Sequence, residues 1–384
     1  MRIPFLRALG QQGFRVTAVA SANPDRFQDA GVAYRKFRFG RFIGPLSDRA
    51  AILDLREILR AERPDLVQSF DTKPNLLAPL ASRGVATAKV VRTVNGLGWV
   101  YSAGGPLALG LRPVQRTLHR LAARCAAATV FQNQDDMTFF ERHRMLGGRM
   151  ARLIPGSGVD LAGFDAAMAS APAASALRAA LGLGSAPVVL TVTRLTRQKG
   201  IPTLLLAAEF VHQLRPDVRF VLVGPRESEG SLAVSQAELD RHAGYVTALG
   251  PRSDVPALLG MADAFAFPTE YREGVPRALL EAALAGLPIV ATRMPGCNDV
   301  IRDGWAGYLV PPRSPRLLAA RILDLLGNRE AAAEMGIRAR ERVVAEFGLD
   351  LTVARYCRLY REVLCGGAGD GATDAPVCAP GGRA

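Results

Sequence analysis

Short apolar runs alternate with longer helical patterns along almost the whole chain. This alternation limits the possible folds more than any other feature of the sequence. In the first half, strand-like runs occupy residues 15–21, 33–39, 66–70, 89–94 and 127–132. In the second half they occupy residues 188–192, 219–224, 246–249, 264–267 and 288–292. Strands that alternate with helices form βαβ units, and these units assemble into parallel sheets. The chain is therefore predicted to be an α/β protein.

The chain is long enough for two such sheets. Its 384 residues are 49% hydrophobic, and domains usually take about 100–200 residues each. Residues 160–185 are rich in Ala, Gly and Ser, and the α/β pattern restarts after them. We therefore predict two doubly wound parallel sheets with a cleft between them. Residues 366–384 are rich in Gly, Ala and Pro and are predicted to form a flexible tail.

Cysteine usage and hydropathy exclude several classes of protein. The five cysteines are scattered and form no C-x-x-C pair, which argues against a structural zinc site or a disulfide framework and favours a reducing cytoplasm. No window approaches the roughly 18 consecutive apolar residues of a membrane-spanning helix. The first residues also lack the apolar core and cleavage site of a secretory signal, so none is expected.

The positive charge is concentrated in the first half. The net charge is +13, and residues 1–150 hold 23 Arg and Lys against 11 Asp and Glu. Such a domain attracts nucleic acid, anionic lipid or phosphorylated substrates, although general solubility would also explain it. No helix-turn-helix, RNP-type motif or zinc-finger spacing is present, so no nucleic-acid partner is expected. Two basic stretches could face a membrane: the aromatic-rich segment 34–43, and a helix predicted over 112–125 whose shared face carries Arg112, Arg116, Arg120 and Arg124.

Residues 271–292 contain the most specific candidate site. Gly274, Val275 and Pro276 are predicted to open a helix over 275–284, because Pro is favoured in a first helical turn. The N–H groups of a helix start form an anion site, and Gly274 would let a phosphate approach the backbone closely. Glu273 precedes this helix and Glu281 lies roughly 9 Å along it, so their carboxylates could hold hydroxyls at the two ends of a sugar–diphosphate–ribose ligand. Two such Glu residues could also be ordinary surface charges.

A second candidate site follows the strand at 188–192. The loop after it carries Arg194, Arg197 and Lys199, and Gly200 opens the next helix. Cations beyond the C-terminal end of a parallel strand lie where α/β sheets bind ligands, and beside a helix start they suit a diphosphate. The loop is not a Walker A motif, and taken alone it could equally be a solvated turn.

In this order, the motifs resemble those of the retaining GT-B enzymes of glycosyltransferase family 4. The segment E-G-V-P-R-A-L-L-E, from Glu273 to Glu281, is similar to the E-x7-E motif of that family. T-R-L-T-R-Q-K-G is similar to its G-R-L…K-G loop, with Thr193 where Gly is usual. The segments 156–160, 294–300 and 303–307 also match. Residues 72–75, 93–98 and 131–136 resemble the bacterial subgroup that extends undecaprenyl-diphosphate-linked sugars.

The resemblance implies a GT-B fold with an acceptor-binding domain over residues 1–158 and a nucleotide-sugar-binding domain over 159–347. Residues 348–365 would form a helix that packs back toward the first domain. The implied reaction moves a hexose or N-acetylhexosamine from a nucleotide sugar, with UDP expected, to a lipid-linked saccharide of a bacterial surface glycan. Retention is implied, with no cofactor and no bound metal, and the sequence contains no D-x-D triplet. The protein would act at the inner face of the cytoplasmic membrane, against its anionic surface.

The resemblance also assigns roles to residues. Glu273, Arg194 and Lys199 would be catalytic, the first at the donor sugar and the two cations at its diphosphate. The donor site would comprise Arg194, Lys199, Gly274, Val275, Pro276 and Glu281, the last at the ribose hydroxyls. The acceptor side would comprise Asp71, Lys73, Asn75, Asn95 and Gly96. Many family members carry a His near the segment 67–71, which has none, so the general base is unidentified and Asp71 is a weak candidate.

Two other functions stay open at this point. A nucleotide-sugar epimerase on the same fold would act on the donor alone, without a second substrate. A catalytically silent, membrane-associated binding protein would keep the two-domain shell and bind the nucleotide sugar without turnover. The sequence does not indicate the oligomeric state, the donor sugar or the acceptor glycan.

The first twenty residues depart from the family pattern. Apolar residues recur at helical spacing over 3–9, Gly13 fits a helix C-cap, and residues 15–20 already read as a strand. The family's domains open with a strand and a Gly-containing loop before the first helix. We therefore expect that the first strand of the N-terminal domain is missing from this sequence and that about 15–25 residues upstream, in frame, encode it.

Overall fold

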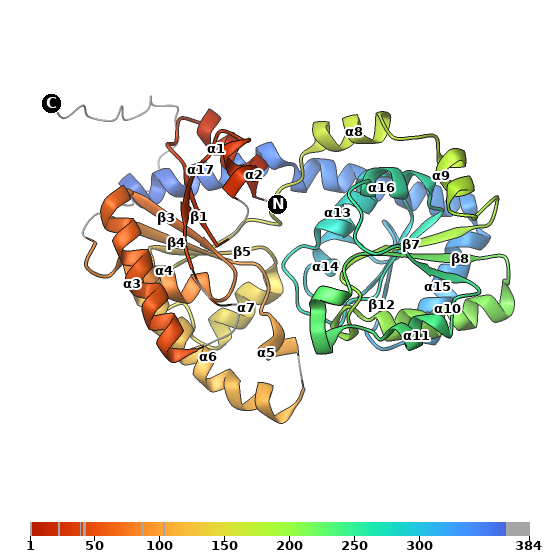
Figure 1. The fold of residues 1–384 in the computed structure, drawn as a ribbon, viewed down its shortest axis with the longest axis horizontal. Helices are drawn as coiled ribbons and strands as arrows, with labels where there is room; N and C mark the ends of the chain where they lie inside the picture. The colour runs from red at the N-terminus through yellow and green to blue at the C-terminus, as the bar shows by residue number, and fades with distance from the viewer. Residues whose placement is uncertain are drawn as a thin grey trace.

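The computed structural model describes residues 2–21, 24–38, 40, 44–85, 88–102 and 104–365, and within them the chain forms two α/β halves (Figure 1). Every strand pairing in both halves is parallel among the described residues. The predicted fold class is therefore confirmed. The tail predicted over 366–384 lies outside the described residues.

The C-terminal half contains a six-stranded sheet in the order β12-β11-β10-β7-β8-β9. Its strands are β7 (Val188–Val192), β8 (Arg219–Val223), β9 (Val246–Ala248), β10 (Ala264–Phe267), β11 (Ile289–Thr292) and β12 (Tyr308–Val310). The central strands β7 and β10 are almost wholly buried, because helices cover both faces of the sheet. The strand order reverses between these two strands, and α/β sheets bind ligands at such a switch point, beyond the C-terminal strand ends.

Helices connect these strands and cover the sheet. They are α10 (Ile201–Leu214), α11 (Gln236–Asp240), α12 (Val255–Met261), α13 (Arg277–Leu284), α14 (Cys297–Val300), α15 (Pro315–Gly327) and α16 (Arg329–Phe347). Two short 3-10 turns, η1 (Arg197–Lys199) and η2 (Glu227–Leu232), lie in the loops after β7 and β8. The Ala-rich segment predicted as the junction forms two helices of its own, α8 (Leu161–Ala169) and α9 (Ala174–Ala180).

The N-terminal half contains two separate sheets. A four-stranded sheet has the order β3 (Leu66–Phe70), β4 (Lys89–Val94), β5 (Ala128–Phe131) and β6 (Met150–Leu153). The strands β1 (Thr17–Ala20) and β2 (Ala33–Lys36) pair only with each other. Within the described residues α1 (Ile3–Gln11) precedes every strand, in agreement with the sequence pattern. The expected opening strand upstream of residue 1 stays a prediction.

The helices of this half are α2 (Pro24–Gln28), α3 (Pro45–Glu62), α4 (Pro74–Ser82), α5 (Trp99–Ser102), α6 (Pro106–Arg124) and α7 (Gln134–Arg142). Helix α6 begins six residues earlier than the sequence pattern predicted, because Pro106 supplies a favourable first-turn residue and Pro113 is accommodated inside the helix.

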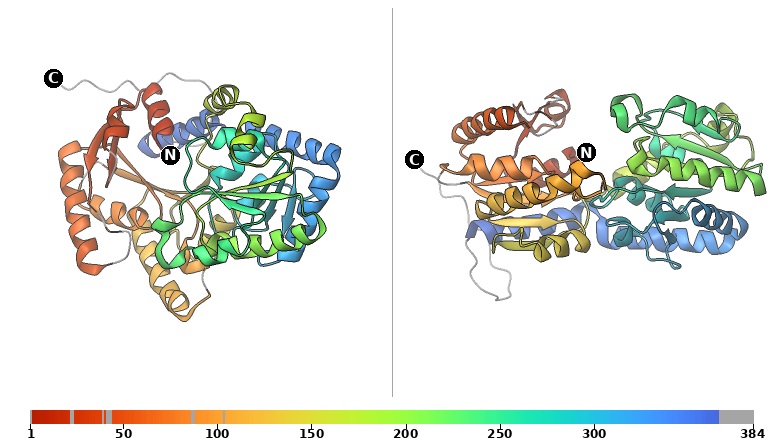
Figure 2. Two further views of the ribbon diagram at one scale, coloured as in Figure 1. Left: turned by 45° about the vertical axis from the view of Figure 1, so that its right-hand side comes forward. Right: turned by 90° about the horizontal axis from the view of Figure 1, so that it is seen from below.

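Helix α17 (Leu349–Cys365) returns from the C-terminal half and packs on the N-terminal half (Figures 1 and 2). The ring of Tyr356 lies 5.1 Å from that of Phe5, and its hydroxyl forms a 2.9 Å hydrogen bond with Thr93. The chain crosses between the halves near Val159 and again near Gly348. These two crossings lie side by side, because Val159 and Gly348 form an isolated parallel bridge. The core of the first half is thus completed by residues from the end of the described chain.

Candidate active site

The two predicted motifs meet at the switch point of the C-terminal sheet. Lys199 ends the turn η1 after β7, and Glu273 lies in the loop after β10. Lys199 Nζ is 2.5 Å from Glu273 Oε1, and the side chains are only 7% and 18% exposed. The hydroxyl of Thr269 donates to the same carboxylate oxygen at 3.0 Å. The pair is thus a largely buried ion pair at the edge where the sheet topology predicts a ligand site.

Gly200 allows the loop of Lys199 to pass close to the loop of Glu273. Its φ is +69°, and a Cβ atom there would lie 1.8 Å from the carbonyl oxygen of Pro268. A side chain at this position would therefore force the two loops apart. The glycine of the K-G motif is explained by this contact between backbones.

Arg194 lies on the same loop as Lys199 but has a different partner. Its Nη1 is 2.7 Å from Glu229 Oε2 in η2, and the Glu229 side chain is 7% exposed. Glu229 was not found from the sequence, because it lies in an irregular turn with no motif and is brought to Arg194 only by the fold. The arginine is thus held by a buried carboxylate beside the strand ends.

Glu281 lies on α13, where its Oε1 accepts a hydrogen bond from Nε of Arg277 at 2.7 Å. The two residues are four apart, a spacing that places them on one face of a helix, so the sequence carried the signal for this pair. Arg277 orients the Glu281 carboxylate at the first turns of α13.

The predicted start of this helix was wrong by two residues. Helix α13 begins at Arg277, and Pro276 is its N-cap residue in an extended conformation. Pro276 cannot donate a hydrogen bond, and it disfavours a helical conformation at Val275, which is buried in the C-terminal core. The extended stretch before the helix carries the chain into contact with the N-terminal half.

Gly274 faces the N-terminal half in this structure. Its N–H donates to the carbonyl of Asn95 at 3.1 Å, and a Cβ atom on Gly274 would lie 2.0 Å from Gln132 Oε1. A larger residue here would have to displace the Gln132 side chain, so the glycine permits close contact between the two halves. The Gly274 N–H is thus bonded to the N-terminal half in this structure, and the expected place of Gly274 in the donor site stays a prediction.

Three of the five acceptor-side residues lie beside the loop of Glu273. The Nδ2 of Asn95 donates to Asp71 Oδ1 at 2.8 Å, and Asp71 has a positive φ of 72°. Gly96 also has a positive φ, and a Cβ atom there would lie 2.6 Å from the carbonyl oxygen of Arg272. These residues form the N-terminal wall opposite the donor-side motifs.

The other two acceptor-side residues have structural partners. Lys73 Nζ lies 2.5 Å from Asp48 Oδ1 and donates to the carbonyl of Gly40. Asn75 is 1% exposed, accepts from the hydroxyl of Ser69 and donates to the carbonyl of Thr93. Asn75 therefore ties β3, α4 and β4 together, and its side chain is enclosed rather than presented to a substrate.

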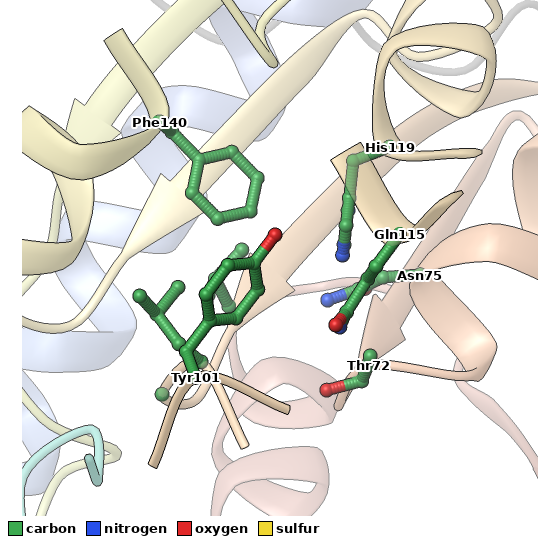
Figure 3. Close-up of a pocket in the computed structure, with 9 residues that line it drawn as sticks. Thr72, Asn75, Tyr101, Gln115, His119 and Phe140 are labelled. Atoms are coloured by element: carbon green, nitrogen blue, oxygen red, sulfur yellow. The ribbon is translucent and has the colours of Figure 1, made fainter. Parts of the chain in front are cut away.

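A small cavity lined by both polar and apolar side chains lies behind this wall (Figure 3). It measures about 10 Å³, and the side chains of Asn75, Tyr101, Gln115 and His119 converge on it. Burial lowers the pKa of His119 to about 3, so the imidazole is neutral at physiological pH. A space of this size accommodates one water molecule and excludes a sugar, so the cavity belongs to the packing of the N-terminal half.

The part of the chain that the structure describes contains neither a candidate metal site nor a candidate membrane span. No group of three or more His, Cys, Asp or Glu side chains is placed to hold a metal ion there. In the same residues, no helix has the length and apolar character needed to cross a membrane.

Comparison with known families identifies the chain. Residues 5–156 match the glycosyl transferase 4-like domain, and residues 175–342 match the glycosyl transferases group 1. The chain belongs to the family 4 glycosyltransferases. It is an enzyme of this family with the GT-B fold, and the Lys199–Glu273 pair lies within the second matched region.

Similar proteins match between 70% and 94% of the chain. One is the N,N'-diacetylbacillosaminyl-diphospho-undecaprenol alpha-1,3-N-acetylgalactosaminyltransferase of Campylobacter jejuni, 25% identical over 94% of this chain and 95% of the relative. Another is the UDP-Gal:alpha-D-GlcNAc-diphosphoundecaprenol alpha-1,3-galactosyltransferase of Escherichia coli, 28% identical over 70% of this chain and 68% of the relative. The crystal structure of Anabaena HepE with UDP-glucose has a TM-score of 0.74 and 20% identity, covering 94% of this chain and 95% of HepE, and shows the same fold.

Proposed function

We propose that this glycosyltransferase moves a hexose or N-acetylhexosamine from UDP to a saccharide linked to a polyprenyl diphosphate, with retention and without a bound metal. The observation that carries the proposal is the buried Lys199–Glu273 pair at the switch point, facing the N-terminal wall. The names of the two relatives above support a lipid-diphosphate acceptor, and one of them names a UDP sugar.

In this mechanism two of the three cations on the loop after β7, Arg194 and Lys199, bind the donor diphosphate. Both are paired with carboxylates in the structure, Arg194 with Glu229 and Lys199 with Glu273. The donor diphosphate would bind to both cations while they keep their carboxylate partners. Their positive charge then stabilises the negative charge that develops on the leaving UDP. Lys199 thus takes the place of a metal ion.

Glu273 acts at the donor sugar and Glu281 at the ribose. The carboxylate of Glu273 accepts hydrogen bonds from sugar hydroxyls and stabilises the positive charge of an oxocarbenium-like transition state. Glu281, oriented by Arg277, accepts the ribose hydroxyls. The first N–H groups of α13 add donors to the diphosphate, and Pro276, at the N-cap, adds none.

A panel of nucleotide sugars, incubated with polyprenyl-diphosphate-linked saccharides with and without EDTA, tests the proposal. We expect one donor and acceptor pair to give a product heavier by one sugar, with unchanged yield in EDTA and with the donor's anomeric configuration kept by NMR. Isomerised donor without acceptor would identify an epimerase instead. Binding of the nucleotide sugar without turnover would identify a silent binding protein.

Arg194→Ala is expected to raise the Kd for UDP about 10–100-fold. The substitution removes charge-assisted hydrogen bonds to the diphosphate, each worth roughly 1.5–3 kcal/mol. Arg197→Ala is the matched control, because Arg197 lies on the same loop but pairs with Glu238 at the surface. Calorimetric titration with UDP measures both variants. Parental affinity in Arg194→Ala, or an equal loss in Arg197→Ala, would contradict the diphosphate assignment.

The N-terminal half is proposed to bind the anionic inner membrane surface. Its excess of cations accompanies exposed apolar side chains, of which Leu46 and Leu107 are 84% and 68% exposed. Leu107 lies in the first turn of α6. Helix α6 lies on the lower edge of this half in Figure 1. Lys and Arg near such a surface contribute on the order of 1 kcal/mol each, and apolar side chains enter the interface.

Sedimentation with vesicles tests this surface. We expect binding to phosphatidylglycerol vesicles that weakens as salt rises from 0.1 M to 1 M, because the Debye length falls from about 10 Å to about 3 Å. Leu107→Asp should weaken binding several-fold. Leu214→Asp is its control, since Leu214 is 71% exposed on the C-terminal half. If the bound fraction did not change with salt concentration or with lipid charge, the proposal would be contradicted.

A further inference from the structure

The loop that carries Glu273 is bonded to the N-terminal half through three consecutive residues. The bonds run from the Arg272 N–H to Ser102 Oγ (2.9 Å), from Asn133 Nδ2 to the Glu273 carbonyl (3.1 Å) and from the Gly274 N–H to the Asn95 carbonyl (3.1 Å). The backbone on both sides of Glu273 is therefore fixed by partners from the other half.

An ion pair strengthens this contact. Arg272 Nη2 lies 3.0 Å from Asp136 Oδ1, and the Asp136 side chain is fully buried in the first turn of α7. The guanidinium of Arg272 also lies 5.5 Å from the centre of the Phe139 ring. Burial raises the pKa of Asp136, and the neighbouring guanidinium opposes that effect. A buried carboxylate in this place needs its partner from the other half.

Asn133 connects the ion pair to the backbone of Glu273. As the N-cap of α7, its Oδ1 accepts from the Asp136 N–H at 2.7 Å, and its Nδ2 donates to Asp136 Oδ2 at 3.0 Å. The same Nδ2 donates to the carbonyl of Glu273. One side chain thus touches both the buried carboxylate and the residue that carries the catalytic carboxylate.

Two glycines make this contact sterically possible. A Cβ atom on Gly96 would lie 2.6 Å from the backbone carbonyl oxygen of Arg272, and one on Gly274 would lie 2.0 Å from Oε1 of the Gln132 side chain. The backbone of the Glu273 loop therefore lies directly against the wall formed by the loop after β4.

We propose that Asp136 and Arg272 are positioning residues for the transfer reaction. Their ion pair docks the N-terminal half against residues 271–276 and so fixes the Glu273 carboxylate opposite Lys199. The inference rests on the proposed function, because it assigns Glu273 its role at the donor sugar. In this proposal the N-terminal half binds the acceptor and also holds Glu273, a donor-side residue, in position.

Three variants test the inference: Asp136→Asn, Arg272→Met and the double variant. We expect each single variant to lower kcat at least about 10-fold, with donor and acceptor KM changed less than about threefold. The double variant should be no slower than the slower single one, because both substitutions break the same contact. Asp165→Asn and Arg340→Met, which break an exposed ion pair elsewhere in the C-terminal half, are the controls and should keep the parental kcat.

Hydrogen–deuterium exchange gives a readout that needs no activity. The amides of Arg272 and Gly274 donate to the N-terminal half, so their exchange should accelerate about 10-fold or more in Asp136→Asn, while amides of α10 keep the parental rate. Acceleration throughout the protein, or a loss of activity that appears only in KM, would show a general structural role and overturn the inference. Parental kcat in both single variants would also overturn it.

The two failures can be told apart. If the parent transfers no sugar with any donor, the proposed function fails, and the docking contact is then judged by exchange alone. If the parent is active and the variants match it in rate and exchange, the proposed function stands and the positioning role fails.

Discussion

Replacing Glu273 with Gln is expected to lower kcat by at least about 100-fold, while the affinity for UDP stays equal to the parent's or increases. Each tenfold loss corresponds to about 1.36 kcal/mol of transition-state stabilisation, and the variant loses the negative charge that stabilises the developing oxocarbenium ion in the proposed mechanism. Gln keeps the size of the side chain and its bond with Thr269. It also releases Lys199 from its counter-charge, which favours the diphosphate.

Steady-state kinetics and UDP titration measure these two effects. Glu270→Gln is the matched control, because Glu270 lies on the same loop, is 15% exposed and is also ion-paired, with Arg313. Its kcat should change less than about threefold. Near-parental turnover in Glu273→Gln would remove the role assigned to its carboxylate.

Replacing Lys199 with Met is expected to impair both the fold and the reaction. The substitution leaves Glu273 buried without its cation, and breaking a buried pair typically costs about 3–5 kcal/mol of stability. It also removes one of the two cations proposed to bind the diphosphate, so the Kd for UDP should rise about 10–100-fold. Thermal denaturation and UDP titration report the two losses separately.

The double variant Lys199→Met/Glu273→Gln separates stability from function. Neither buried charge remains, so the melting temperature should recover much of the loss. UDP binding and transfer should not recover, because the diphosphate still lacks its cation. Restored binding in the double variant would falsify the assignment of Lys199 to the diphosphate.

The sequence predicted those parts of the site that follow from sheet topology. Lys199 and Glu273 both lie beyond the C-terminal ends of adjacent parallel strands, and such ends meet at one edge of the sheet. Strand spacing and the K-G and E-x7-E motifs were therefore enough to place the two residues near each other. The α/β class followed from the same regular alternation.

The contacts between segments far apart in the chain could not be predicted. The partner of Arg194 lies in a turn without a motif, and the bond that occupies the Gly274 N–H comes from the other half of the molecule. Asn75 was expected to face the acceptor, but its side-chain amide is hydrogen-bonded to Ser69 of β3 and to Thr93 of β4. In each case the deciding factor is tertiary packing, which a single sequence does not encode locally.

The packing of α17 has a consequence for how the protein is made. Phe5, Val91 and Val130 belong to a core that is closed by Val353, Tyr356 and Tyr360, so the first half of the chain leaves the ribosome with one apolar face uncovered. At about 5–20 residues per second, the covering helix follows the end of that half by roughly 10–40 s. During this interval the nascent chain exposes an apolar, aggregation-prone surface beside unpaired strand edges. Synthesis of the C-terminal half must finish before the N-terminal half can reach its native state. Chaperones that bind the nascent chain should therefore bind the first half.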